Sequence, residues 1–343
     1  MVNSVAIVKT SSLGDIIQAF VGLHYLKNRF PSIHVTWIAE RPAETLLRSH
    51  PLIDQVHTID TQAWRKNCIT YFQKVREFKK SICPVDLVFD LQGNCKSALI
   101  TACIPAKIKV GFGWHSVAEK PNILCTNRHI EISKALHASK RYLHLIGQYF
   151  QDKDPEISST VALRISNEEQ LFLSKILSSD ALQHRPKWLI APGSIWRNKQ
   201  LPDAIWTEFI AYYKDPVFIL VFRGEEEKKR ALFLKQLAPE RVLLVGEVSL
   251  PFIQALMRNM DLVISADSAL LHLSATTHIP SFSFFGPSSS AVYKPFGEHN
   301  RCFQGSCPYN ETFLMRCSKL RTCPTGACLR SVSFNEVFNN LKR

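Results

Sequence analysis

The 343-residue sequence predicts an α/β fold made of two similar domains, each a parallel β-sheet covered by helices. Three observations support this prediction. A chain of this length exceeds the usual size of a single hydrophobic core. Short apolar runs alternate with helix-compatible segments in both halves, which is typical of parallel sheets with helical crossovers. Between the halves, the polar stretch 151–159 contains Pro155 and has the composition of a linker.

Each half contains five apolar runs that are predicted strands. In the first half they cover residues 4–9, 33–39, 55–59, 86–93 and 108–113. In the second half they cover residues 187–193, 217–224, 241–247, 261–267 and 280–287. The first domain is therefore expected over residues 1–160 and the second over residues 161–330.

Helix-start signals complete the prediction at two places. A helix is expected after Ser166, where Ser166 or Asn167 would cap it and the following glutamates favour its positive end. The stretch 333–343 is amphipathic and begins with a serine, so residues 331–343 are expected to form a C-terminal helix.

The composition is that of a soluble globular protein, with 46% apolar and 21% charged residues. No apolar run is long enough to cross a bilayer, and the first residues lack the charged and apolar regions of a signal peptide. Ten cysteines in such a chain indicate reduced thiols or metal ligands rather than disulfides. Four of them follow one another without a C-x-x-C spacing, so a metal site and plain thiols both stay open: Cys307, Cys317, Cys323 and Cys328.

The net charge of +13 indicates an anionic partner. The surplus is +8 over residues 1–165, from 21 basic and 13 acidic residues, and +5 over the remainder. A phosphorylated small molecule, a nucleic acid or an anionic membrane surface would suit it. The sequence has no arginine-rich tract, zinc-finger spacing or RNP-like motif, so no nucleic-acid partner is expected.

The stretch "VKTSSLGDII", residues 8–17, reads as a strand, a tight loop and a helix start. It has one glycine and no G-x-G-x-x-G, and a carboxylate at the helix start would repel a phosphate, so it is a poor nucleotide cradle. Asp15 could instead accept a proton from a substrate hydroxyl. It could instead cap the helix, aided by Ser11 and Ser12; the spacing alone favours the cap, and the sequence leaves both interpretations open.

The second half offers the anion-binding groups that the first half lacks. After a predicted strand, "GSIWRNK" at 193–199 carries Ser194, Arg197 and Lys199, whose donors suit phosphate oxygens. After the strand at 261–267, Asp267 is expected to cap a helix whose first N–H groups could hold a diphosphate.

Three further residues of the second half are candidates. Ser268 adds a hydroxyl beside Asp267, and His272 could face the same place, although a lone histidine is also common as a structural residue. Glu225 follows a predicted strand and could bind the hydroxyls of a ribose, or it could be part of a solvated helix start.

Several of these stretches resemble signatures of one family, the bacterial lipopolysaccharide heptosyltransferases of glycosyltransferase family 9. They are "VKTSSLGD" (8–15), "FDLQGNCKSA" (89–98) and "DSALLHL" (267–273). The stretches "AWRK" (63–66), "GFGWHS" (111–116) and "LHASKR" (136–141) are similar to those of its heptosyltransferase I branch. The matches run in consistent order from residue 5 to about 287, and the N-terminal half carries most of the likeness to that branch.

The resemblance implies a GT-B architecture, in which two Rossmann-like, doubly wound domains face a central cleft. In this architecture, the C-terminal helix at 331–343 would pack back on the first domain. It implies transfer of heptose from ADP-L-glycero-D-manno-heptose to a Kdo residue of the lipid A inner core, with inversion at the anomeric carbon and without a metal ion or cofactor. The partners would be ADP-heptose, the Kdo-lipid A acceptor and the anionic inner-membrane surface. Basic residues would suit such an anionic acceptor, so we expect a monomer that is cytoplasmic and peripheral on the inner face of the inner membrane.

The resemblance also implies roles for individual residues. Asp15 matches the family's proposed general base. The implied donor-binding residues are Ser194, Lys199, Glu225, Asp267, Ser268 and His272. The implied acceptor-binding residues are Ser12, Arg65, Lys66, Gln92 and Lys96.

Two departures from the family pattern keep alternatives open. Leu201 stands where the family has a tryptophan after the donor-site lysine, and the cysteine-bearing tail is more similar to that of heptosyltransferase II. A family 9 transferase with another acceptor or donor, of the heptosyltransferase II type or for another surface glycan, is the main alternative. A non-catalytic nucleotide-sugar binder would keep Lys199 and Asp267 but would have no use for Asp15. A dehydrogenase is disfavoured because no G-x-G-x-x-G follows a strand.

Overall fold

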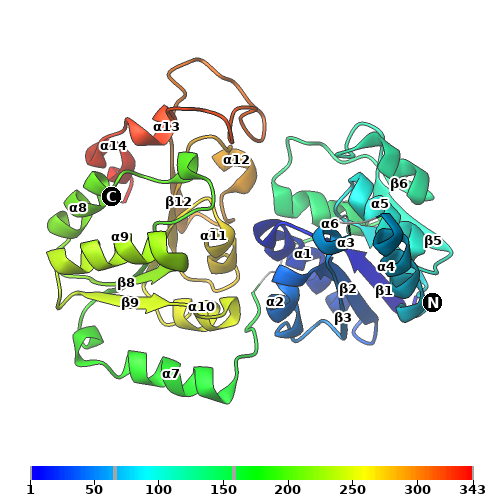
Figure 1. Cartoon of the computed structure of the whole chain (residues 1–343), viewed down its shortest axis with the longest axis horizontal. Helices are drawn as coiled ribbons and strands as arrows, with labels where there is room; N and C mark the ends of the chain where they lie inside the picture. Colours follow the sequence, from blue (N-terminus) through cyan, green and yellow to red (C-terminus); the bar gives the residue numbers. More distant parts are fainter. Residues whose placement is uncertain (1, 65–67, 157–159, 342–343) are drawn as a thin grey trace. The chain divides into compact units, whose positions relative to one another are not determined.

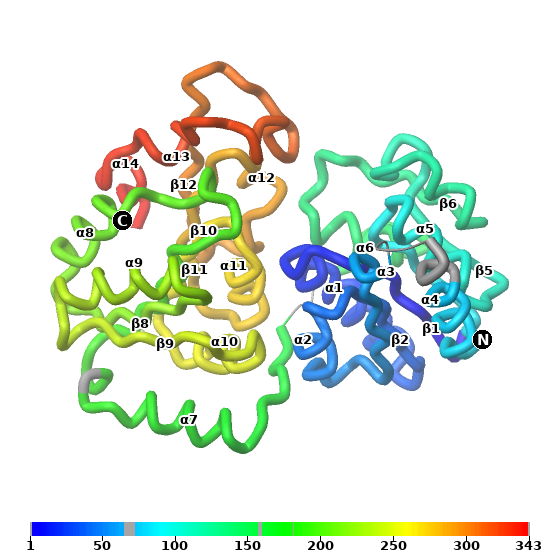
Figure 2. The backbone as a smooth tube through the Cα atoms, in the orientation of Figure 1, coloured from blue at the N-terminus to red at the C-terminus, as the bar shows by residue number. Residues whose placement is uncertain are grey.

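The computed structural model describes residues 2–64, 68–156 and 160–341. The chain divides into two compact units, Met1–Ser159 and Thr160–Arg343, which are drawn from blue to green and from green to red in Figure 1. Each unit is an α/β domain with one parallel sheet, and the backbone path through both is traced in Figure 2.

The sheet of the first unit has the strand order β3-β2-β1-β4-β5-β6 among the described residues. Its strands are β1 (Ser4–Val8), β2 (His34–Glu40), β3 (Gln55–Ile59), β4 (Leu87–Asp90), β5 (Ile108–Phe112) and β6 (Arg128–Ile130). Its helices are α1 (Leu13–Arg29), α2 (Glu44–Arg48), α3 (Thr61–Trp64), α4 (Cys68–Ser81), α5 (Cys95–Cys103) and α6 (Ala138–Tyr149), with short 3-10 turns η1 (Arg41–Ala43) and η2 (Lys120–Cys125).

Helices bury both faces of this sheet. On one face, Ala6 and Val8 pack with Phe78 of α4 and Ile100 of α5. On the other face, the ring of Trp37 in β2 meets Phe20 of α1 with centroids 5.8 Å apart. Because both faces are covered, the central strands are apolar without alternation, as parallel strands require.

The sheet of the second unit has the order β12-β11-β10-β7-β8-β9 among the described residues. Its strands are β7 (Lys187–Ala191), β8 (Val217–Phe222), β9 (Val242–Gly246), β10 (Leu262–Ala266), β11 (Ser281–Phe285) and β12 (Asn300–Gln304). Its helices are α7 (Asn167–Leu177), α8 (Asp203–Tyr212), α9 (Gly224–Leu237), α10 (Leu250–Met257), α11 (Ala269–Ser274), α12 (Ser290–Tyr293), α13 (Ala327–Arg330) and α14 (Phe334–Phe338), with 3-10 turns η3 (Asp180–Leu182) and η4 (Arg197–Lys199).

The two units share one topology. Read from the other edge, the second sheet is β9-β8-β7-β10-β11-β12, which repeats the order of the first sheet strand for strand. In such doubly wound sheets the strand order reverses at the middle, between β1 and β4 in the first unit and between β7 and β10 in the second. Loops at the carboxyl ends of these four strands are the expected ligand sites.

The ten predicted strands are all present, and two strands were not predicted. The missed strands, β6 and β12, lie at sheet edges and have the polar sequences RHI and NRCFQ. An edge strand buries less of its surface, so it needs fewer apolar residues and gives a weaker signal in the sequence. The predicted cap of α7 is confirmed: the hydroxyl of Ser166 accepts from the N–H of Glu169, and Glu169 accepts from the N–H of Ser166.

The C-terminal helix differs from the expectation. Helix α14 begins after Ser333 as predicted, but it ends at Phe338, and its apolar side chains lie in the core of the second unit. The ring of Phe338 packs on Phe209 of α8 with centroids 4.6 Å apart. The apolar side chains of α14 thus belong to the core of the second unit, and the expectation that the helix packs back on the first domain stays a prediction. Leu201, only 1% exposed, lies in the same core.

In the part of the chain that the structure describes, no helix combines the length and the apolar character needed to span a membrane.

Candidate functional site

In the first unit, Asp15 and Ser12 close the start of helix α1. The Asp15 carboxylate accepts hydrogen bonds from the N–H of Ser12 at 3.2 Å and from its hydroxyl at 2.8 Å, both at Oδ2. Ser12 is exposed and Asp15 is half-buried. The capping interpretation of Asp15 is thus confirmed, and its role as a base stays a prediction.

Gln92 links the two central strand-end loops of the first unit. It follows β4, and its Oε1 accepts from the backbone N–H groups of Thr10 and Ser11, each at 3.2 Å, in the loop after β1. The side chain predicted to bind an acceptor therefore also holds the loop that carries Ser12.

Asp90 holds Gln92 in turn. This fully buried carboxylate accepts from the N–H groups of Gln92 and Gly93 at Oδ1, each at 2.9 Å, and from Asn122 Nδ2 at 2.7 Å at Oδ2. Gly93 adopts a φ of 72°, which favours glycine and lets the chain turn back into α5. Asp90 therefore positions Gln92 through the backbone.

Lys96 of α5, a predicted acceptor-binding residue, is paired with a carboxylate. Its Nζ lies 2.9 Å from Oε1 of Glu40, at the end of β2, and Glu40 also accepts from the N–H of Thr61 at 3.1 Å. Glu40 was not singled out in the sequence. The two other predicted basic residues, Arg65 and Lys66, lie outside the described residues.

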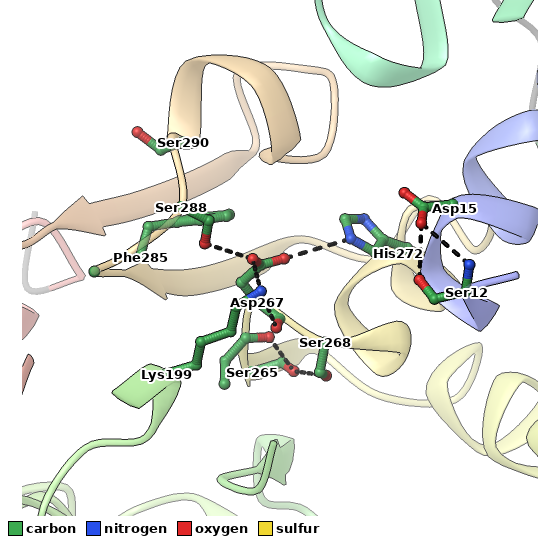
Figure 3. Close-up of polar contacts among 12 residues, drawn as sticks. Ser12, Asp15, Lys199, Ser265, Asp267, Ser268, His272, Phe285, Ser288 and Ser290 are labelled. Carbon is green, nitrogen blue, oxygen red and sulfur yellow. Dashed lines mark hydrogen bonds and ion pairs between the residues drawn. The ribbon is translucent and has the colours of Figure 1, made fainter. Parts of the chain in front are cut away.

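In the second unit, a buried ion pair links the loops after β7 and β10 (Figure 3). Lys199 Nζ, at the end of the turn η4, lies 2.5 Å from Oδ2 of Asp267, which follows β10 directly. The two side chains are only 9% and 6% exposed. Oδ2 of Asp267 also accepts from the Ser288 hydroxyl at 2.5 Å, and Nε2 of His272 lies 3.5 Å from Oδ1.

This arrangement corrects the predicted role of Asp267 as a helix cap. Helix α11 begins at Ala269, the N-cap position belongs to Ser268, and the Asp267 carboxylate turns instead to Lys199 and His272. The reason is electrostatic, since a buried carboxylate gains more from a cation than from one further backbone N–H.

The surroundings keep Asp267 ionised. Burial by itself would raise the pKa of Asp267, but the hydrogen bond with His272 and the positive charge of Lys199 outweigh burial and place it below its usual range. The second unit therefore holds a fixed negative charge that orients a lysine and a histidine at the centre of the sheet.

The other predicted donor-side residues lie on neighbouring loops. The backbone oxygen of Ser194 accepts from Gln200 Nε2, and the Ser268 hydroxyl lies 3.3 Å from that of Ser265. Glu225 is 77% exposed at the first turn of α9 and pairs with Lys228 at 3.5 Å. The neighbouring Glu227 packs against the loop after β7. Its Oε1 lies so close to Gly193 that a Cβ added there would be 2.0 Å away.

The four tail cysteines, Cys307, Cys317, Cys323 and Cys328, line one cavity of about 30 Å³, enough for a single water molecule. Within the described residues, no three His, Cys, Asp or Glu side chains are grouped so that they could hold a metal ion. Burial raises the pKa of the Cys328 thiol to about 11, whereas the N–H of Gly326 lowers that of Cys323.

Sequence reasoning missed the partners that hold the candidate residues. Asp90 is the last residue of β4 and stands in the quoted "FDLQG" stretch, and Ser288 stands in "GPSSS", shortly after β11. A polar residue at or shortly after the end of a buried strand was therefore the available signal. Glu40 gave the same signal at the end of β2, but nothing in the sequence indicated its partner.

A family model described as glycosyltransferase family 9 (heptosyltransferase) matches residues 75–321. Lipopolysaccharide heptosyltransferase 1 of Campylobacter coli is 28% identical over 302 residues, which cover 83% of this chain and 84% of that protein. The protein of the same name from Pseudomonas aeruginosa is 26% identical over 324 residues, with 90% and 88% covered. The structure of E. coli heptosyltransferase WaaC with ADP-2-deoxy-2-fluoro heptose has the same fold, with a TM-score of 0.78, 23% identity and 99% of each chain covered.

Proposed function

Because the chain belongs to glycosyltransferase family 9 (heptosyltransferase), we propose that it moves heptose from ADP-L-glycero-D-manno-heptose to a Kdo residue of the lipid A inner core. It is a glycosyltransferase with the GT-B fold, built from two Rossmann-like domains. The likeness to the lipopolysaccharide heptosyltransferase 1 proteins over most of the chain supports this donor and this acceptor over others.

The buried Lys199–Asp267 pair is the observation that carries the donor side of the proposal. It ties together the two loops at the middle of the second sheet, where doubly wound folds bind nucleotides. An ammonium has three N–H donors, so a lysine that Asp267 holds still has donors for phosphate oxygens. Lys199 would thus stabilise the charge that develops on the ADP leaving group.

The remaining donor contacts follow from the same loops. Ser194, Ser268 and His272 would contact the diphosphate, and Glu225, exposed at the start of α9, would contact the ribose hydroxyls. Hydroxyl groups and an imidazole carry no negative charge, so they can donate hydrogen bonds to an anion.

On the acceptor side, Asp15 is proposed as the general base. It would take the proton from the acceptor hydroxyl as the hydroxyl oxygen attacks the anomeric carbon of the heptose. The new glycosidic bond forms on the face opposite to the departing ADP, so the configuration inverts. Its two hydrogen bonds to Ser12 would hold the carboxylate in one orientation.

An anionic, lipid-linked acceptor fits the charge of the chain. Kdo carries a carboxylate, and Lys96, Gln92 and Ser12 would contact it, together with Arg65 and Lys66. The net charge of +13 supports association with the anionic cytoplasmic face of the inner membrane, where the lipid of the acceptor stays. We propose that the enzyme acts there as a peripheral monomer.

The test combines purified protein with ADP-heptose and Kdo-lipid A and follows ADP release and product mass. Asp15→Asn should lower kcat at least about a hundredfold, since positioned bases contribute two to four orders of magnitude. Glu336→Gln is the matched control, because Glu336 caps α14 through the N–H and hydroxyl of Ser333, just as Asp15 does with Ser12.

The outcomes separate the readings of the site. A normal rate in Asp15→Asn would reject Asp15 as the base. ADP-heptose binding without product on Kdo-lipid A, but with product on an inner core that already carries heptose, would favour a heptosyltransferase II type acceptor. Binding without any transfer would leave a nucleotide-sugar binder, and no binding would reject the donor.

A further inference from the structure

The cysteine-bearing segment 305–330 packs against the loops that hold the Lys199–Asp267 pair. It follows β12 and returns to the sheet at α13, all within the second unit. Its sequence indicates no role beyond a possible metal site, and the described residues group no metal ligands there. Its contacts with the strand-end loops are nevertheless extensive.

Asn198 fixes the loop after β7 to this segment. Its Nδ2 donates to the backbone oxygens of Leu320 at 3.0 Å and Cys323 at 3.1 Å. The space beside Asn198 is tight as well, since a Cβ added at Gly326 would lie 2.5 Å from Asn198 Oδ1. Asn198 thereby links two parts of the chain that lie more than a hundred residues apart in the sequence.

A second contact holds the same turn. The guanidinium of Arg321 lies over the ring of Trp196, 4.8 Å from its centroid, and Trp196 immediately precedes η4. Within the turn itself, the N–H of Lys199 donates to the oxygen of Trp196 at 2.9 Å. A three-residue 3-10 turn has few hydrogen bonds of its own, so outside anchors decide its position.

The loop after β11, which carries the partner of Asp267, is anchored to the same segment. The N–H of Ser289 donates to the oxygen of Met315 at 2.9 Å, and the N–H of Cys317 donates to the oxygen of Pro287 at 2.8 Å. Ser288 lies between them and donates to Asp267. Segment 305–330 therefore holds Lys199 through its neighbour Asn198, and it holds the loop whose Ser288 donates to Asp267.

We infer that Asn198 is a positioning residue for the donor. Its two hydrogen bonds hold the turn that carries Lys199 against segment 305–330, so the affinity for the nucleotide depends on these bonds. The inference rests on the proposed function, because it assumes that Lys199 binds the diphosphate. Asn198 itself needs no contact with the donor.

The test measures ADP binding by isothermal titration calorimetry in the full-length chain. Asn198→Ala should weaken ADP binding about tenfold, the effect of about 1.4 kcal/mol, while Lys199→Ala should weaken it further. The decisive variant combines both changes, because residues that act through one another are not additive. In the Lys199→Ala background, Asn198→Ala should change the affinity less than twofold.

Two further variants control the experiment. Asn259→Ala removes a similar amide-to-carbonyl bond, from Asn259 Nδ2 to the oxygen of Ala255 at 2.8 Å, far along the chain from η4, and should bind ADP as the wild type does. Arg321→Ala loosens the same turn from an exposed position. It should weaken ADP binding two- to threefold. If Asn198→Ala does not fold, this variant still tests whether the position of the turn affects ADP binding.

Equal weakening by Asn198→Ala with and without Lys199 would overturn the inference, as would wild-type affinity in Asn198→Ala and in Arg321→Ala. In an assay of turnover, the effect should fall on the KM for the nucleotide sugar and spare the KM for the acceptor. If Lys199→Ala binds ADP as the wild type does, the proposed donor site itself fails, which is a different result.

Discussion

Replacing Asp267 by asparagine keeps the shape of the side chain and removes its charge. The change leaves the Lys199 ammonium, on a side chain 9% exposed, without its counter-charge. It also weakens the interaction of Oδ1 with His272 and leaves an amide beside the Ser288 hydroxyl. The second unit should therefore lose stability as well as ADP affinity.

The magnitude follows from the geometry. At the observed separation of 2.5 Å and an effective dielectric constant of about 20, Coulomb's law gives a gross attraction of about 7 kcal/mol. Desolvation offsets part of it, and removing one partner of a buried pair usually costs about 3 to 5 kcal/mol. We expect Asp267→Asn to lower the free energy of unfolding by an amount in this range.

The double variant Asp267→Asn with Lys199→Met gives the reasoning its sharpest test. Methionine removes the stranded charge, so most of the lost stability should return, to within about 2 kcal/mol of the wild type. ADP affinity should stay low, because the charge that would meet the phosphates is gone. The double variant should thus recover its free energy of unfolding without recovering its affinity for ADP.

Urea unfolding followed by circular dichroism measures the change, and the transition that ADP shifts belongs to the second unit. Asp203→Asn is the matched control, since Asp203 is 55% exposed although it lies 2.6 Å from Arg230. It should cost less than about 1 kcal/mol. A loss below 1 kcal/mol in Asp267→Asn, or a double variant as unstable as the single one, would refute the reasoning.

Three further predictions concern the rest of the fold. Burial lowers the pKa of His24 from 6.5 to about 4. Between these pH values, His24 is protonated in the unfolded chain and neutral in the folded chain. The free energy of unfolding should therefore decrease as the pH is lowered from 7 to 5. His24 should account for about 2 kcal/mol of this decrease, and urea unfolding of His24→Leu should lack that contribution. Gln92→Ala removes the acceptor for two backbone N–H groups before α1 and should lower kcat about tenfold with unchanged ADP affinity in calorimetry. Phe338→Ala empties a fully buried position and should cost the second unit about 3 to 5 kcal/mol in urea, while unchanged stability would contradict its placement in the core.

The central strands could be predicted because parallel strands covered on both faces need continuous apolar runs, as in "VFILVF" of β8. The edge strand β12 could not, because its residues NRCFQ serve pairing with β11 more than burial. Helix α14 was predicted at its first residue, where Ser333 forms a cap, but not in its packing. Which core an amphipathic face joins depends on the shape of that core, which no local pattern encodes.

The candidate site shows the same limit. Residues such as Asp15, Lys199 and Asp267 could be found from the sequence because each follows or lies near a strand end with an unusual side chain. Their partners could not, since Lys199 and Asp267 meet across 68 positions of sequence. Asp267 illustrates the consequence: local reasoning assigned it to the nearest helix, whereas the buried lysine was the stronger partner.

The repeated topology would let one architecture serve the two different roles proposed for its units. In each unit, one side chain ties together the two loops at the middle of the sheet, Gln92 in the first and Lys199 in the second. Gln92 is neutral and holds the loop directly before α1. It therefore places no positive charge beside the carboxylate of Asp15, whose proposed role is to accept a proton. Lys199 is cationic and is balanced by one buried carboxylate, so its loop suits a diphosphate. If the first tie were also cationic, it would pair with Asp15 and stabilise its ionised form, which would make Asp15 a weaker base. The neutral tie in the first unit is therefore what the proposed mechanism requires.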